Sequence, residues 1–189
     1  VRRTLARFVM TDGLIRLGGN LVVPFFSVYF VRELGASEAW FGTLRVVERT
    51  IEVIAMLAIA PVASRFGPVA TIALSQLASV PMLLGLGFAP NLGVASGIFL
   101  IRGTLMEMTV PLRDNFMMDR LPPGSRATVS ASVLLFGYAI AFFSGLAGGQ
   151  MVESGLRHLT YIVAGALYTI SAVLFFRLFH DQSREKSHA

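Results

Sequence analysis

Six stretches of about 20 mostly apolar residues follow one another along this chain, separated by breaks rich in Gly, Pro, Asn and Ser. About 20 apolar residues are enough for a helix to cross a membrane. Strands of a membrane β-barrel would be about half as long and would alternate in polarity, so the pattern favours helices. The predicted spans are about 5–31, 39–60, 68–88, 92–112, 127–152 and 159–179. The sequence therefore predicts an all-α integral membrane protein, with a single six-helix domain over residues 1–189 that ends in a cytoplasmic tail at 180–189.

The composition excludes an ordinary soluble domain. Hydrophobic residues make up 54% of the chain and charged residues only 14%, against roughly 25% charged in a typical soluble domain. One core of a 189-residue chain could not hide that much apolar surface from water. There is no cysteine, and the histidines form no ligand cluster, so we expect no metal site and no cofactor. No nucleophile elbow or phosphate-binding loop is present either, which argues against an enzyme.

The positive charges predict how the chain is oriented in the membrane. If the N-terminus is placed in the cytoplasm, all the basic residues of the loops and ends are cytoplasmic except Arg32 and Arg157. An excess of Lys and Arg in cytoplasmic loops is typical of membrane proteins. We therefore expect a multi-pass protein of the cell membrane, a bacterial inner or plasma membrane, with both termini cytoplasmic. This distribution also accounts for the net charge of +5 without nucleic acid as a partner. Arg113 and Asp114 are expected to anchor the fourth span at the interface.

Charged residues lie inside three of the predicted spans, and such residues normally face protein or a water-filled cavity. In the first span, Asp12 and Arg16 are four residues apart and share a helix face, which Asn20 continues. A local ion pair and a pair that opens when substrate or a proton arrives both fit this spacing. The third and sixth spans carry no such charges in their interiors and are expected to face lipid.

The second span carries Arg45, Glu48, Arg49 and Glu52 within an otherwise apolar helix. Their spacing is i, i+3, i+4 and i+7, which places them in one stripe along one side of a helix. The signs alternate, so Arg45 can pair with Glu48 and Arg49 with Glu52. A stripe of this kind within a membrane has to turn toward protein or a cavity.

In the fourth span, Arg102 and Glu107 are five residues apart and do not share a face closely. Each therefore needs a partner on another helix. The open alternatives are Arg102 with Glu48 or Glu52, and Glu107 with Arg45 or Arg49. In the fifth span, Gly145 and Gly149 have the spacing of a small-residue motif that lets helices pack closely.

Four local sequences, in this order, resemble one half of a major facilitator superfamily transporter. They are "NLVVPFFSVYFVRELGAS", "APVASRFGP", "MDRLPPGSRATVSA" and "FSGLAGG". In the second of them, Arg65 and Gly67 match the family loop between the second and third helices of a half, whereas Ser64 stands where the family has Asp. The resemblance covers the whole chain. The basic tail and the degenerate loop motif favour the C-terminal half, and the absence of an initial Met favours a fragment.

The resemblance implies secondary active transport of a small solute by alternating access, proton- or ion-coupled and in the direction of efflux. It implies that Arg65 and Gly67 belong to a cytoplasmic gate and that the first and fourth helices line the pathway. The candidate protonation sites are Asp12, Glu48, Glu52 and Glu107, and the candidate substrate or counter-charge residues are Arg16, Arg45, Arg49 and Arg102. The expected partners are a small-molecule substrate, the lipid bilayer, and an N-terminal six-span half or a second copy. The alternatives are structural ion pairs for these residues, and for the chain a non-transporting membrane protein or a half-size subunit active only as a dimer.

Overall fold

The computed structural model describes residues 2–184, and within that range the chain is helical with short connections. The 3₁₀ and π segments are labelled η. In chain order the elements are α1 (Arg2–Val22), η1 (Val23–Phe25), α2 (Phe26–Val28), η2 (Tyr29–Glu33), α3 (Glu38–Phe66), α4 (Pro68–Gly87), α5 (Leu92–Glu107), α6 (Val110–Met118), η3 (Pro123–Ser125), α7 (Arg126–Glu153) and α8 (Arg157–Arg184).

Five helical segments in this range are long and apolar enough to cross a membrane, and each corresponds to a predicted span. They are Leu5–Glu33, Pro68–Gly87, Leu92–Met118, Pro123–Glu153 and Arg157–Phe179. The remaining predicted span corresponds to α3, which has 29 residues. Its length suffices to cross a membrane, but its charged stripe sets its composition apart from that of the other five segments. Whether α3 crosses a membrane therefore depends on how those charges are neutralised.

The ends of α3 and α8 show how local sequence sets the helix boundaries. Ser37 accepts a hydrogen bond from the backbone N–H of Trp40 and so caps the start of α3. Gly67 ends α3 with a φ of 82°, a conformation that glycine adopts without strain, and Pro68 begins α4. α8 continues to Arg184, so the first residues of the predicted tail are helical, and their cytoplasmic location stays a prediction. Residues 185–189 of that tail lie outside the described residues.

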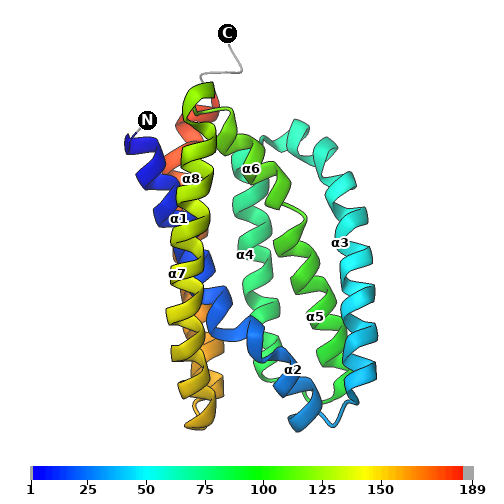
Figure 1. The fold of residues 1–189 in the computed structure, drawn as a ribbon. Coiled ribbons are helices and arrows are strands. Elements are labelled where there is room, and N and C mark those ends of the chain that lie inside the picture. Colours follow the sequence, from blue (N-terminus) through cyan, green and yellow to red (C-terminus); the bar gives the residue numbers. More distant parts are fainter. Residues whose placement is uncertain (1, 185–189) are drawn as a thin grey trace.

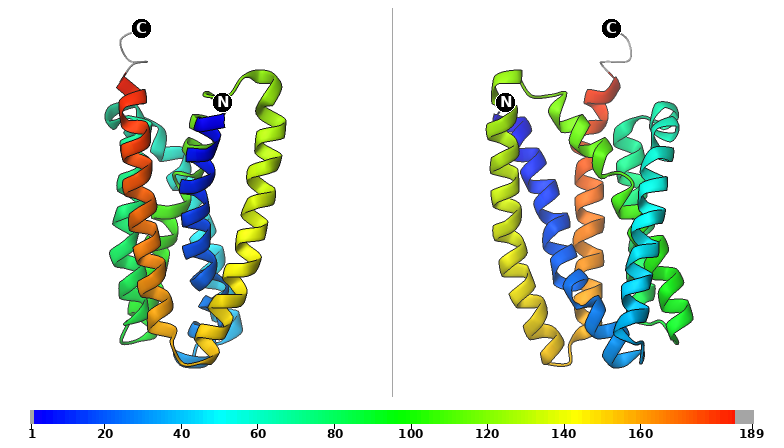
Figure 2. Two further views of the ribbon diagram at one scale, coloured as in Figure 1. Left: turned by 90° about the vertical axis from the view of Figure 1, so that its left-hand side faces the viewer. Right: turned by 45° about the vertical axis from the view of Figure 1, so that its right-hand side comes forward.

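The helices form a bundle in which the start of α1, the α3–α4 turn and the α6–α7 connection lie at one end (Figures 1 and 2). The α4–α5 and α7–α8 connections lie at the other end. At this second end, Arg157 of α8 makes an ion pair with Glu33, and its guanidinium carbon lies 4.9 Å from the centre of the Tyr29 ring. These contacts hold the end of the first helical segment against the start of α8.

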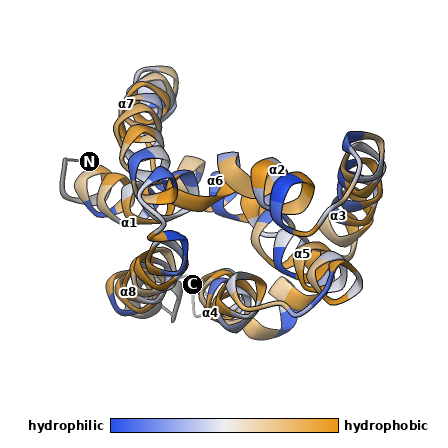
Figure 3. Ribbon diagram, turned by 90° about the horizontal axis from the view of Figure 1, so that it is seen from below, coloured by the Kyte–Doolittle hydropathy of each residue, from blue (hydrophilic) through white to orange (hydrophobic). Residues whose placement is uncertain are grey.

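Seen along the bundle, α3 and α7 lie on opposite flanks, and α1, α2, α5 and α6 lie between them (Figure 3). α4 and α8 form the back of the bundle and pack against each other, with α8 also against α1 and α4 also against α5. That the third and sixth spans face lipid stays a prediction, but they are not the least buried helices of the bundle. The most apolar stretch of α4 is 50% buried, against 17% for that of α7, because the back helices have neighbours on more sides.

Two aromatic clusters make up the core and leave a polar layer between them. Toward one end, Phe26, Phe30 and Phe99 pack with ring centres 5.3–5.4 Å apart. Toward the other, Phe8 and Phe179 pack at 4.5 Å within a second cluster that includes residues of α6 and α8. Ile15 of α1 and Tyr168 of α8, which belong to the first cluster, also line the candidate site.

The close approach of α7 to α1 occurs at Gly148, not at the predicted Gly145. A Cβ on Gly148 would lie 2.5 Å from the backbone oxygen of Leu21, whereas a Cβ on Gly145 would meet no atom within 4 Å. Gly149 is in ordinary contact with the Phe25 ring, 3.5 Å from such a Cβ. The i, i+4 motif was identified correctly as a small-residue segment, but the register of the contact depends on the tilt of α7, which the motif does not encode.

We expect Gly148→Ala to destabilise the fold and Gly145→Ala to leave it unchanged or slightly stabilised. The alanine methyl at position 148 would overlap a backbone atom that cannot move independently, and overpacking of this kind costs about 1–3 kcal/mol. At position 145 the only effect is the better helix propensity of alanine. Thermal unfolding of both variants in detergent tests this, and equal midpoints would contradict the assigned register.

Candidate functional site

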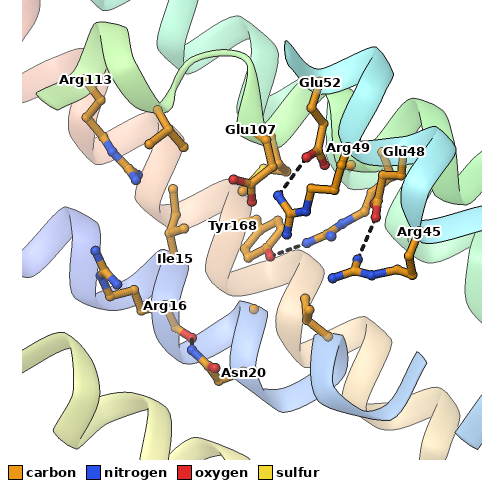
Figure 4. Close-up of a pocket in the computed structure, with 16 residues that line it drawn as sticks. Ile15, Arg16, Asn20, Arg45, Glu48, Arg49, Glu52, Glu107, Arg113 and Tyr168 are labelled. Carbon is orange, nitrogen blue, oxygen red and sulfur yellow. Dashed lines mark hydrogen bonds and ion pairs between the residues drawn. The ribbon is translucent and has the colours of Figure 1, made fainter. Parts of the chain in front are cut away.

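A cavity of about 330 Å³ opens between α1, α3, α5, α6 and α8 in the polar layer of the bundle (Figure 4). All the predicted pathway residues except Asp12 line it: Arg16, Asn20, Arg45, Glu48, Arg49, Glu52, Arg102 and Glu107. The other lining residues are Ile15, Gly19, Val23, Gly103, Met106, Val110, Arg113 and Tyr168. The structure thus brings together charged residues from α1, α3, α5 and α6.

The stripe on α3 forms the two ion pairs that its spacing predicts. Arg45 Nη1 lies 2.6 Å from Glu48 Oε2, and Arg49 Nη1 lies 2.7 Å from Glu52 Oε2. Both carboxylates are almost fully enclosed, with 1% and 2% of each residue exposed. The side chain of Arg49 is 57% exposed, so this pair reaches from the protein interior to the open side of the cavity.

Asp12 lies beside the cavity and binds two arginines. Its Oδ2 is 2.5 Å from Arg16 Nε, one turn along α1, and its Oδ1 is 3.4 Å from Arg113 Nη2 on α6. Asn20 donates a hydrogen bond of 2.7 Å to the backbone oxygen of Arg16 and extends the polar face of α1. The expectation that Arg113 is an interface anchor is wrong, because α6 turns this side chain into the bundle, where it lines the cavity and pairs with Asp12.

Arg102 does not form either of the cross-helix ion pairs considered for it. Its Nη2 donates a 2.7 Å hydrogen bond to the hydroxyl of Tyr168 on α8, and its guanidinium carbon lies 5.5 Å from the centre of the Phe26 ring. Within residues 2–184, Glu107 likewise makes no ion pair with Arg45 or Arg49. The reason is local: the carboxylates of α3 bind the arginines of their own helix.

Two of the spans that border the cavity, the first and the fourth, are interrupted there. The first span changes to a 3₁₀ turn at Val23–Phe25, where Pro24 cannot continue the α-helical hydrogen bonds, and Val23 lines the cavity. The fourth span breaks between Glu107 and Val110, which also line the cavity. Irregular backbone at membrane depth is tolerated where it lines a cavity, and discontinuous helices often mark transporter sites.

A model of the Major Facilitator Superfamily matches residues 11–189, which is nearly the whole chain. The chain belongs to the major facilitator superfamily. None of the curated proteins searched matches it. The family makes this a membrane protein and a transporter of the major facilitator kind, with a small-molecule substrate and the lipid bilayer as its surroundings. Its members are transporters rather than enzymes, which agrees with the lack of a catalytic motif in the sequence.

The predicted gate residues of this facilitator lie at the α3–α4 turn, away from the cavity. Gly67 forms the turn, and the guanidinium carbon of Arg65 lies 5.6 Å from the centre of the Phe66 ring. Neither residue lines the cavity. A role for this loop in a gate stays a prediction.

Sequence reasoning did not identify Tyr168 and Gly103 as site residues. Tyr168 is a buried tyrosine in an otherwise apolar span, and the need of its hydroxyl for a partner was the available signal. Gly103 faces Glu48: a Cβ there would overlap the carboxylate oxygen. The sequence gives no sign of this contact, because it depends on how closely α5 approaches α3.

Proposed function

We propose that this chain carries out secondary active transport of a small solute by alternating access, coupled to protons, with the cavity as its binding site. The observation that carries the proposal is the cavity itself. It gathers ionisable side chains from several helices, together with two helix interruptions, inside a bundle of mostly apolar helices. Polar residues within membrane segments are costly and mark substrate or proton pathways.

The ion pairs of α3 supply a physical basis for coupling. Glu48 and Glu52 are enclosed, and each neutralises one arginine. Protonation of either carboxylate removes the negative charge and leaves its arginine free to attract a substrate group or another acid. Proton binding and substrate binding would thereby depend on each other, as coupled transport requires.

We further propose that α3 is a sixth span and that another six-span unit, an N-terminal half or a second copy, faces it. Arg49 is 57% exposed in the middle of a helix of membrane-spanning length. Lipid contact there would be costly, so protein or water should cover this side. The basic residues at the end that holds the α3–α4 turn support a cytoplasmic location for that end, and for both termini of the chain.

The test is solute-driven proton movement in liposomes that contain the protein carrying this chain and an internal pH dye. Sugars, amino acids, organic acids and amines are added in turn. We expect one class to move protons, and we expect Glu48→Gln and Glu52→Gln to lower that rate at least about tenfold, the equivalent of about 1.4 kcal/mol. Glu38→Gln, at the exposed start of α3, is the matched control and should behave as the wild type.

The outcomes separate the alternatives. Solute uptake without proton movement would overturn the coupling, and proton movement in the direction opposite to the solute would support efflux. If no class is transported by the chain either alone or as a dimer, it is a non-transporting six-span protein.

A further inference from the structure

Two charges in the cavity have no counter-ion within the part of the chain that the structure describes. Arg102 is only 6% exposed, and its one hydrogen-bond acceptor is the neutral hydroxyl of Tyr168. Its Nε is enclosed and has no acceptor. Glu107, half-buried on the same helix, also lines the cavity and forms no ion pair among the described residues.

Within the described residues no acid makes an ion pair with Arg102 and no arginine makes one with Glu107, although Glu48 lies close enough to Arg102 to interact with it electrostatically. Asp12 binds Arg16 and Arg113, and the α3 carboxylates bind their own arginines. The rings of Phe26 and Tyr168 lie 5.5 and 5.9 Å from the Arg102 guanidinium carbon and offset part of its desolvation, but they carry no charge. A buried charge without an ion pair is costly, so the cavity offers one cation and one anion that no ion pair among the described residues satisfies.

The positions of the two residues indicate how far apart the complementary charges of a ligand should be. The Cα atoms of Arg102 and Glu107, five residues apart, are separated by a rise of about 7.5 Å along the axis of α5, and we take this rise as the scale of the ligand. Apolar side chains of Ile15, Met106 and Val110 line the same cavity. Figure 4 shows Glu107 and Glu52 on facing helices around one part of the cavity, with Arg49, the ion-pair partner of Glu52, between them. The volume of about 330 Å³ is at the small end of ligand pockets, which span about 300–1,000 Å³.

We propose that the cavity binds a small elongated zwitterion, with its anionic group toward Arg102, its cationic group toward Glu107 and a short apolar chain between them. An ω-amino acid is the simplest molecule of this class. Its carboxylate would neutralise the guanidinium, and its ammonium group the carboxylate of Glu107. The inference rests on the proposed transport function and specifies the substrate class of the same site.

The test is equilibrium binding to the purified protein in lipid nanodiscs, measured by calorimetry. The probes are 6-aminohexanoate, hexanoate, which lacks the cation, hexylammonium, which lacks the anion, and leucine, an isomer of 6-aminohexanoate whose two charges are adjacent. We expect 6-aminohexanoate to bind the wild type at least about tenfold more tightly than the other three.

Two substitutions assign the groups. Arg102→Gln should remove the preference for 6-aminohexanoate over hexylammonium, and Glu107→Gln should remove the preference over hexanoate. Arg102→Lys keeps the charge and should keep the preference, which separates the charge effect from misfolding. Arg177→Gln, at an exposed position of α8 outside the cavity, is the control and should bind as the wild type does.

Equal wild-type binding of hexanoate or hexylammonium would overturn the zwitterion, and tighter binding of leucine would overturn the separation of its charges. Absence of binding by all four probes would overturn the proposal even if solute-driven proton movement is observed in liposomes. Binding of 6-aminohexanoate without any transport would support this inference and overturn the transport function instead.

Discussion

Gly103→Ala is expected to lower transport about 100-fold, the equivalent of about 2.7 kcal/mol. A Cβ at this position would overlap the Glu48 carboxylate oxygen and lie 2.9 Å from its Cδ and 3.1 Å from its Cγ. The side chain of Glu48 would have to leave its enclosed position, and its 2.6 Å ion pair with Arg45 would break. A single methyl group would thus remove a pair that we assign to coupling, without changing any charge.

The stability of the Gly103→Ala variant should fall as well. Breaking a buried ion pair costs about 3–5 kcal/mol when one partner stays buried and unpaired. Arg45 has 35% of its side chain exposed and can reach water, so we expect a smaller loss of about 2 kcal/mol. Thermal unfolding in detergent measures this loss, and the liposome assay measures the transport rate.

Gly97→Ala is the matched control for this substitution. Gly97 lies on the same helix, and a Cβ there would meet no atom within 4 Å. Alanine should therefore preserve transport and stabilise the helix by up to about 1 kcal/mol. Adding Glu48→Ala to Gly103→Ala should cost little further stability, because the ion pair with Arg45 is already lost, and it should not restore transport. If Gly103→Ala transports as the wild type does, either the close contact of α5 and α3 or the role of Glu48 is wrong.

The helices and the α3 ion pairs could be predicted from the sequence because both depend on local spacing. Apolar stretches set the helix lengths, and residues three apart on one helix, such as Arg45 and Glu48, are neighbours whatever surrounds them. The start of α3 was close to prediction, where Ser37 caps the helix, but α3 runs past the predicted end near residue 60 to Phe66. The fourth span was harder: it breaks near Met108 and continues past the predicted end to Met118.

The contacts between helices could not be predicted, because they depend on the rotation and tilt of each helix in the bundle. Glu48 and Glu52 were the partners considered for Arg102, yet its side chain donates to Tyr168, a neutral residue on a helix predicted to face lipid. Arg113 lies at the end of a predicted span but turns inward to Asp12. In each case local pairing or packing determines the partner, and only the assembled bundle shows which acids remain available.

Asp12→Asn is expected to destabilise the protein by about 3 kcal/mol, at the lower end of the cost of breaking buried ion pairs. The carboxylate is the counter-ion of both Arg16 and Arg113, whose side chains are 36% and 17% exposed, and its own side chain is 13% exposed. Asparagine keeps the shape and one hydrogen-bond acceptor but removes the charge. Two partly buried arginines would then face each other without a compensating acid, and α1 would lose its ionic link to α6.

A double-mutant cycle identifies the link between the two helices. Asp12→Asn combined with Arg113→Gln should cost less than the sum of the single losses by about 1 kcal/mol, because the second substitution removes one of the stranded cations. Asp114→Asn, an exposed neighbour of Arg113 that makes no ion pair within residues 2–184, is the control and should change the unfolding midpoint little. If Asp12→Asn is as mild as Asp114→Asn, the three-residue cluster contributes no more than a surface ion pair, and the first and fourth helices of this facilitator are held together by packing alone.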